Sequence, residues 1–170
     1  IGLEGILLLG ALAGALGAEA SGSASIGLLS GIATGALVGL LFGGISTTLR
    51  GSQLIIGVGI NLFALGFVAL MLTVLGAPGF HSVSREIQVP LIPLGVGNLS
   101  PLVPATIVLA VAVWWLLRRT QLGIWIRAVG DNPGAADVAG LPVNALRLGT
   151  AVVAGMLAGL AGAYLSVDWF

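Results

Sequence analysis

The sequence predicts an all-α, polytopic membrane protein, and three features of its composition support that fold class. Hydrophobic residues make up 58% of the 170 residues and charged residues only 7%, whereas a soluble domain carries about a quarter charged residues. The mean hydropathy is +1.16. Apolar stretches of about 20 residues, the length of a membrane-spanning helix, recur along the chain. We therefore expect a transmembrane helical bundle with about five spans, forming one domain over residues 1–170.

The composition also excludes several classes of function. Six basic and six acidic residues cancel, so the chain lacks the cationic surface that binds nucleic acid. It has no cysteine, which excludes disulfides and thiolate metal sites within it. The sequence contains no Walker A loop, HExxH, GxSxG or paired-carboxylate pattern. We expect no catalytic residue, no metal and no cofactor bound by this chain.

The first two apolar stretches differ in length. Residues 1–18 are apolar apart from Glu4 and barely reach spanning length, which predicts a broken or partial helix. After a polar turn at 19–25, residues 26–49 form a full span. Glycines recur in it every fourth residue and share one face, onto which another helix backbone can pack closely. With two glycines of the same spacing in the last span, the predicted packing positions are Gly27, Gly31, Gly35, Gly39, Gly43, Gly155 and Gly159.

One amide and one carboxylate fall within expected membrane depth. Asn61 lies near the centre of the third span, residues 53–76. A buried amide there is costly unless it is hydrogen-bonded, so Asn61 either bridges two helices or faces a substrate path. Glu4 is the only carboxylate expected at this depth. It either caps a neighbouring half-helix through the helix dipole or sits at an interface.

The remaining spans flank two polar segments. Residues 77–101 are rich in proline and predict an extended external loop, with room for an interfacial helix and with His81 as a solvated surface residue. The fourth span, 102–117, ends in two tryptophans suited to a membrane interface. Residues 118–146 form the second polar segment, and residues 147–167 form the last span.

The segment 118–146 contains a well-marked short helix. Asp131 and Asn132 are good N-caps, Pro133 suits the first helical position, and Gly140 suits a C-terminal cap. These signals predict two helical turns over 133–139, too few to be stable alone. Its small side chains would fit a groove on another protein; a plain capped loop helix is the alternative. The predicted docking residues are Asp131, Asn132, Pro133, Ala135, Ala136, Val138, Ala139 and Gly140.

Arginine placement predicts the orientation, because the chain has no lysine. If segment 118–146 is cytoplasmic, counting spans places Arg85 outside and every other arginine inside. Such a bias follows the positive-inside rule. The inside residues are Arg50, Arg118, Arg119, Arg127 and Arg147.

Two stretches resemble a known family. Residues 122–143, LGIWIRAVGDNPGAADVAGLPV, closely resemble the cytoplasmic loop of bacterial ABC importer permeases of the branched-chain amino acid, ribose and nucleoside group. The opening, IGLEGILLLGA, resembles the nucleoside or simple-sugar branch of that group. The resemblance implies a multi-pass permease subunit of the bacterial inner membrane. It also implies that residues 131–140 form the coupling helix that sits on a cytoplasmic ATPase.

The resemblance further implies a set of partners and a substrate class. The partners are the ATPase, which would bind ATP and Mg²⁺, a second permease copy or paralogue, an extracytoplasmic solute-binding protein and membrane lipid. The solute would be a nucleoside or a simple sugar. Candidates for its pathway are residues with amide, hydroxyl, carboxyl or aromatic groups: Glu4, Asn61, Ser46, Thr47 and Phe63.

Two other functions fit the same composition. An ion-coupled secondary transporter would need intramembrane carboxylates, of which only Glu4 is available. A non-transport scaffold would use the glycine faces for assembly and the loop to bind an unrelated partner. The chain opens inside a motif and stops as a helix ends, so we expect it to be a fragment of a longer permease.

Overall fold

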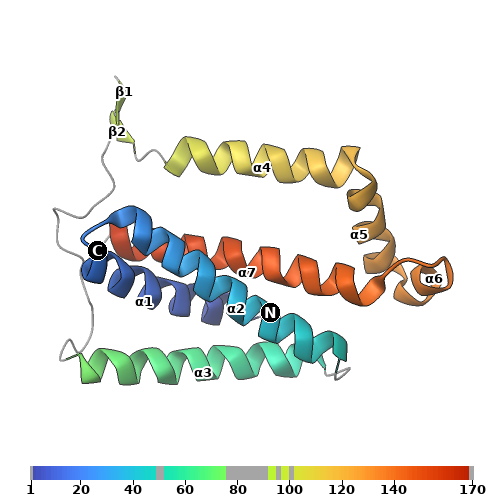
Figure 1. Cartoon of the computed structure of the whole chain (residues 1–170), viewed down its shortest axis with the longest axis horizontal. Helices are drawn as coiled ribbons and strands as arrows, with labels where there is room; N and C mark the ends of the chain where they lie inside the picture. The colour runs from blue at the N-terminus through green and yellow to red at the C-terminus, as the bar shows by residue number, and fades with distance from the viewer. Residues whose placement is uncertain (1, 49–51, 76–91, 95–96, 100–101, 169–170) are drawn as a thin grey trace. The chain divides into compact units, whose positions relative to one another are not determined.

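The structure is a computed structural model that describes residues 2–48, 52–75, 92–94, 97–99 and 102–168 (Figure 1). Its contacts group the chain into two compact units. The first comprises residues 1–88 and 148–170, and the second comprises residues 89–147. The elements, in order, are α1 (Leu3–Ser21), α2 (Ala24–Thr48), α3 (Gln53–Val74), β1 (Ile92–Leu94), β2 (Gly97–Leu99), α4 (Leu102–Arg119), α5 (Gln121–Asp131), α6 (Pro133–Val138) and α7 (Val143–Asp168).

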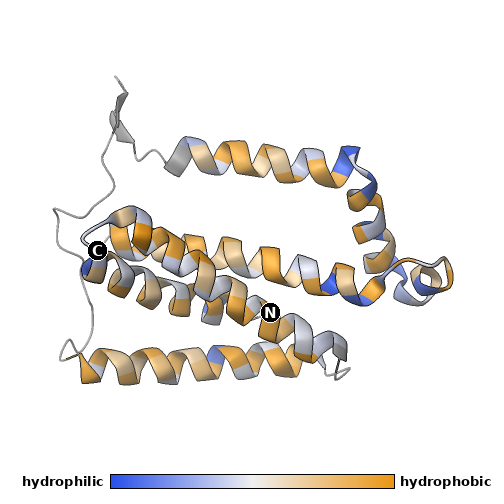
Figure 2. Cartoon of the chain, viewed as in Figure 1, coloured by the Kyte–Doolittle hydropathy of each residue, from blue (hydrophilic) through white to orange (hydrophobic). Residues whose placement is uncertain are grey.

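Most of the described helices have the length and composition of membrane spans. Helices α1, α2, α3 and α7 are each long and apolar enough to cross a bilayer, and α4 with α5 adds a fifth span if this bent pair is counted as one. Figure 2 shows apolar residues along these helices and polar residues concentrated at the α4–α5 bend. The predicted all-α, polytopic bundle with about five spans is confirmed.

The first unit consists of α1, α2, α3 and the part of α7 from Leu148 onward. The α1–α2 turn and the C-terminal ends of α3 and α7 share one end of this unit (Figure 1). The predicted polar turn at 19–25 is too long, because α1 continues to Ser21. The Ser21 hydroxyl donates to the Gly17 carbonyl oxygen at 2.6 Å, so a serine with a partner one turn back extends the helix.

Glycines allow α2 to touch α1 and α7 backbone to backbone. All five glycines of the predicted face are buried. A Cβ built on Gly27 would lie 2.7 Å from the Gly14 carbonyl oxygen of α1, and one on Gly39 would lie 2.7 Å from the Ala151 carbonyl oxygen of α7. Between them, Gly35 faces Gly155 and Gly31 faces Gly159. Close approach of small residues is the usual basis of helix association in membranes.

Gly43, the last predicted packing glycine of α2, also lies against α7. A Cβ on Gly43 would lie 2.9 Å from the Leu148 side chain. Other glycines join these contacts, among them Gly10, Gly14 and Gly162, which allow α1 to lie close to α7. The Ser30 hydroxyl adds a bond between helices by donating to the Ala13 carbonyl oxygen at 2.7 Å.

The second unit contains the β1–β2 hairpin, α4, α5, α6 and the first turn of α7. The strands are antiparallel, with Ile92 opposite Leu99. They lie in the predicted external loop, where we had expected extended chain with room for an interfacial helix. The six described residues are extended, as expected, and the rest of this loop lies outside the described residues. His81 and Arg85 lie outside the described residues.

Candidate docking loop and pathway residues

The docking loop begins with a bend between α4 and α5. The two helices meet at 77°. The Thr120 hydroxyl donates to the Leu116 carbonyl oxygen at 2.6 Å and accepts from the Gly123 amide at 3.2 Å. A Cβ on Gly123 would run into the Leu117 carbonyl. Thr120 therefore ends one helix and caps the next, and Gly123 gives the room for a sharp turn.

Helix α5 itself was not predicted. We had interpreted residues 118–146 as a polar loop with one short helix over 133–139. A helical signal was present, since apolar side chains recur at i, i+3, i+4 and i+7. Those residues are Leu122, Trp125, Ile126 and Val129.

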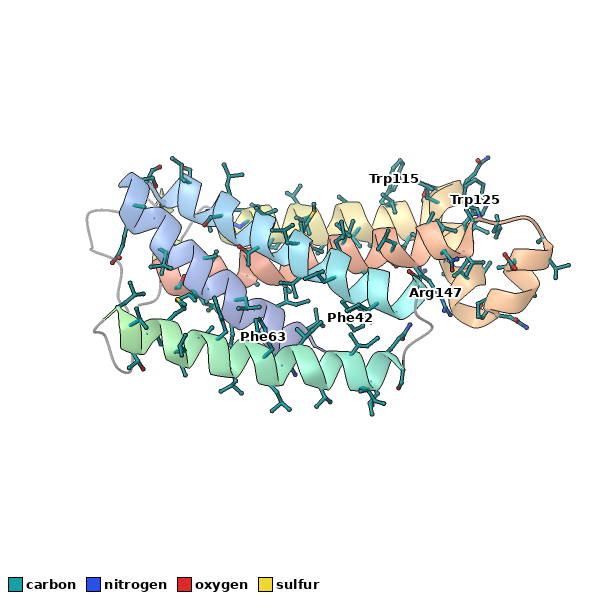
Figure 3. All side chains as sticks on the ribbon, turned by 60° about the horizontal axis from the view of Figure 1, so that its bottom comes forward. Phe42, Phe63, Trp115, Trp125 and Arg147 are labelled. Atoms are coloured by element: carbon teal, nitrogen blue, oxygen red, sulfur yellow. The ribbon has the colours of Figure 1, made fainter. Side chains whose placement is uncertain are left out.

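Aromatic and basic side chains gather where α4 ends. The Arg118 guanidinium lies 5.7 Å from the ring centroid of Trp114, a cation–π contact. Trp115 on α4 and Trp125 on α5 both project outward from their helices (Figure 3), and both are exposed. Tryptophan and arginine are typical of the membrane–water boundary. Their position supports the prediction that α4 reaches an interface near its C-terminal end.

Asn132 joins α5 to α6. Its extended backbone ends α5, and its own amide donates to the Ala128 carbonyl oxygen at 3.1 Å. Its side-chain oxygen accepts from the Ala135 amide at 3.0 Å, and Pro133 follows in the first turn. Asp131, the other predicted N-cap, is instead the last residue of α5. A capping residue needs extended backbone, which Asn132 has and a helical Asp131 does not.

The end of α6 is closed by hydrogen bonds. The Gly140 amide donates to the Asp137 carbonyl oxygen at 2.9 Å, and the Leu141 amide donates to the Ala136 carbonyl oxygen at 3.0 Å. This pair of bonds defines a Schellman motif and requires a left-handed residue at its centre. Gly140 supplies it with a φ of +81°. Pro142 and the start of α7 at Val143 follow at once, so α6 is held at both ends.

The two faces of α6 differ in exposure, and one predicted docking residue is on the wrong face. Val138 is 91% exposed, and Ala135 and Ala139 are exposed beside it. Ala136, which we expected on the same surface, is only 5% exposed. Positions 136 and 138 lie about 200° apart around a helix, so they cannot face the same way. Because α6 packs against α5, Ala136 belongs to the interior of the loop and Val138 to its surface.

Replacing Asn132 by alanine should loosen α6. Loss of an N-cap costs about 1 kcal/mol, so the Ala135 amide should exchange with solvent about fivefold faster, as measured by hydrogen–deuterium exchange on the full-length protein. Asp131→Ala is the matched control, because Asp131 is the neighbouring exposed residue but does not cap α6. Equal exchange in both variants would contradict the assignment of the cap to Asn132.

Two of the five pathway candidates come together. Glu4 lies in the first turn of α1 and is exposed. The neighbouring Gly5 amide donates to the side-chain oxygen of Asn61 on α3 at 2.8 Å. Asn61 therefore bridges two helices, one of the two alternatives that the sequence left open. Phe63 is also on α3 (Figure 3), where its ring stacks on Phe67 with centroids 5.6 Å apart.

The two hydroxyl candidates lie near the end of α2. Ser46 is buried, with 8% of its surface exposed. The Thr47 hydroxyl donates to the Gly43 carbonyl oxygen of its own helix at 2.7 Å. Within the described ranges, no hydrogen bond joins either residue to Glu4 or Asn61. The five candidates thus do not form one hydrogen-bonded cluster.

Apolar helices of spanning length, joined by a doubly capped loop helix, define a multi-pass integral membrane protein of the cell membrane. The family model described as branched-chain amino acid transport system / permease component matches residues 1–169. The chain belongs to this family of permease components. The resemblance found in the sequence is thereby confirmed, and the location in the inner membrane agrees with it.

Three relatives named as transport proteins are similar to the chain over nearly its whole length. A putative glucose ABC transporter permease protein, TsgC13 of Haloferax volcanii, is 32% identical and covers 98% of this chain and 54% of its own length. The guanosine ABC transporter permease protein NupQ of Bacillus subtilis is 32% identical over 95% of this chain and 56% of its own. The nucleoside ABC transporter permease protein NupC of Lactococcus lactis subsp. cremoris is 31% identical over 96% and 56%.

The chain therefore spans about half the length of the curated relatives it matches. No solved structure matches the chain significantly.

Proposed function

We propose that the chain is part of the transmembrane permease subunit of an ATP-driven importer, and that its solute is a nucleoside or a simple sugar. The exposed, doubly capped α6 is the single observation that carries the coupling part of this proposal. The solute class is supported by relatives named for guanosine, nucleosides and glucose. As a member of a permease family, the chain would leave ATP hydrolysis to a separate subunit.

Helix α6 is suited to pass a rigid-body movement to the spans. Both of its ends are fixed by hydrogen bonds, the single residue Asn132 joins it to α5, and residues 139–142 join it to α7. A groove on the cytoplasmic ATPase would receive Val138 and the exposed alanines Ala135 and Ala139. When ATP and Mg²⁺ close the ATPase, the movement would reach α7 through Pro142 and Val143.

The solute would pass between this subunit and a second permease copy or paralogue, after delivery by an extracytoplasmic binding protein. Nucleosides and simple sugars are neutral and rich in hydroxyl groups, so they need hydrogen-bonding side chains rather than a counter-charge. Glu4 is a candidate in the first turn of α1, which Asn61 of α3 holds through the Gly5 amide. Ser46 and Thr47 are candidates on α2, and Phe63 is a candidate on α3.

Uptake by reconstituted protein tests the proposal. The full-length permease would be co-purified with its ATPase, placed in liposomes with ATP inside or outside, and supplied with binding protein and radiolabelled nucleosides or hexoses. We expect uptake of one solute class that requires ATP on the ATPase side and survives a protonophore. Uptake abolished by the protonophore while ATP is present would favour an ion-coupled transporter. Failure of the folded permease to retain any ATPase would contradict the coupling role of α6.

A further inference from the structure

The first turn of α1 is pressed against the middle of α3. Gly2 precedes the helix in a left-handed conformation with a φ of +92°. A Cβ on Gly2 would lie 3.2 Å from the Gly57 Cα, and one on Gly5 would lie 3.0 Å from both the Asn61 Cα and the Ile60 carbonyl oxygen. Glycines on both helices therefore allow α3 to lie directly against the start of α1.

Within the described residues, the Asn61 side chain is the acceptor for an amide in the first turn of α1. The first four amides of a helix have no acceptor within it, and in a bilayer there is no water to replace that acceptor. Gly5 is the third residue of α1, and its amide donates to the Asn61 side-chain oxygen at 2.8 Å. The residue at the N-cap position is Gly2, which has no side chain to do this. Asn61 acts as an N-cap supplied by another helix.

The capped turn lies at intramembrane depth if α3 spans the bilayer. Asn61 is about 12 Å from the start of α3, a helix about 33 Å long, and a hydrocarbon core is about 30 Å thick. Glu4 is next to the capped residue and is exposed on the surface of its unit. A carboxylate at this depth is costly against lipid and is found facing a water-filled cavity or a partner.

We propose that Asn61 is a positioning residue: it holds the first turn of α1 and thereby sets where the Glu4 carboxylate stands in the solute path, without contacting the solute itself. The proposal rests on the permease function proposed above. A carboxylate is an acceptor of hydrogen bonds and suits the hydroxyl donors that nucleosides and sugars share. The Asn61 side-chain oxygen accepts from the Gly5 amide and so fixes the backbone beside Glu4, whereas the Glu4 side chain itself is exposed.

Thiol labelling tests the position of Glu4 separately from transport. The chain has no cysteine, so Glu4→Cys in the full-length permease, with any cysteine outside this chain replaced, provides a single reactive thiol. A charged, water-soluble maleimide should label it in proteoliposomes. Asn61→Leu removes the acceptor and should change the labelling rate about tenfold, since a lost hydrogen bond releases the turn. Asn61→Ser, which keeps an oxygen acceptor, should restore most of the original rate.

Two controls separate this effect from general misfolding. Leu62→Ala alters the next residue of α3, which is 68% exposed, and should leave the labelling rate of Glu4→Cys unchanged. A thiol at Val138→Cys, on the exposed face of α6, should react at one rate in every Asn61 background if the loop remains folded. Solute KM and kcat would be measured in the same Asn61 variants without the added thiol.

Different results would overturn different claims. If Asn61→Leu raises KM while Glu4→Cys labelling stays constant, Asn61 contacts the solute directly and the positioning role is refuted. An unlabelled Glu4→Cys in the parental protein would show that this turn does not face water, which also refutes the proposal. A third result is that labelling depends on Asn61 but no ATP-driven uptake occurs with any nucleoside or sugar. That result would contradict the proposed transport function and still support the role of Asn61 in positioning the first turn of α1.

Discussion

Val138→Glu is expected to abolish capture of the ATPase by the purified full-length permease while leaving the permease folded. Val138 is 91% exposed on α6, so a glutamate there is fully hydrated in the free protein and does not disturb it. If docking buries this position, the carboxylate is desolvated without a compensating hydrogen bond or opposite charge on the ATPase. Such desolvation costs about 3 kcal/mol or more, which weakens binding roughly a hundredfold. Co-purification from detergent and ATP-dependent uptake would both be measured.

Asn144→Glu is the matched control for this change. Asn144 is exposed in the first turn of α7, six residues beyond Val138, and a negative charge in the first turn of a helix is favourable. The variant therefore introduces the same charge near the same loop without touching the α6 surface, and it should retain the ATPase. Loss of the ATPase in both variants would show general charge repulsion rather than docking through Val138. Retention in both would contradict docking through this face of α6.

The α6 segment shows which features of a site can be predicted from local sequence. The N-cap, the proline at 133 and the left-handed Gly140 depend on neighbours within three or four residues, so the sequence limited the cap to Asp131 or Asn132 and located the other two. The rotation of α6 could not be predicted in the same way. It depends on packing against α5, a helix that we had not predicted, and this is why Ala136 was placed on the docking surface although it is buried.

In the membrane spans too, local features could be predicted from the sequence, whereas contacts between helices could not. The four-residue spacing of glycines was enough to predict which face of α2 is buried, because that spacing is a local property of one helix. It was not enough to predict that the face meets α1 at Gly27 and α7 at Gly39. Likewise, the membrane depth of Asn61 predicted that it needs a partner. Its partner Gly5 is 56 residues away in the chain, so only the fold could identify it.

Gly35→Leu is expected to destabilise the helical unit formed by α1, α2, α3 and α7. A Cβ at Gly35 would collide with the Gly155 carbonyl oxygen and would lie 2.9 Å from the Gly159 Cα. Backbone cannot move aside as a flexible side chain can, so α2 and α7 must separate. Overpacking of this kind costs about 3 kcal/mol, which lowers the apparent Tm by roughly 10 °C. Thermal unfolding of the detergent-solubilised full-length permease measures it.

Gly44→Leu isolates the packing contribution from the change of residue. Gly44 is on the same helix, and no heavy atom of a neighbouring element lies within 4 Å of a Cβ built there. The substitution therefore adds the same apolar volume to α2 without forcing a backbone apart. Because leucine is a better helix former than glycine by about 0.8 kcal/mol, this variant should unfold at the same temperature or slightly higher. If Gly35→Leu and Gly44→Leu behave alike, backbone contact between α2 and α7 does not stabilise the unit. A large difference would instead show that close backbone contact at Gly35 stabilises the packing of α2 on α7.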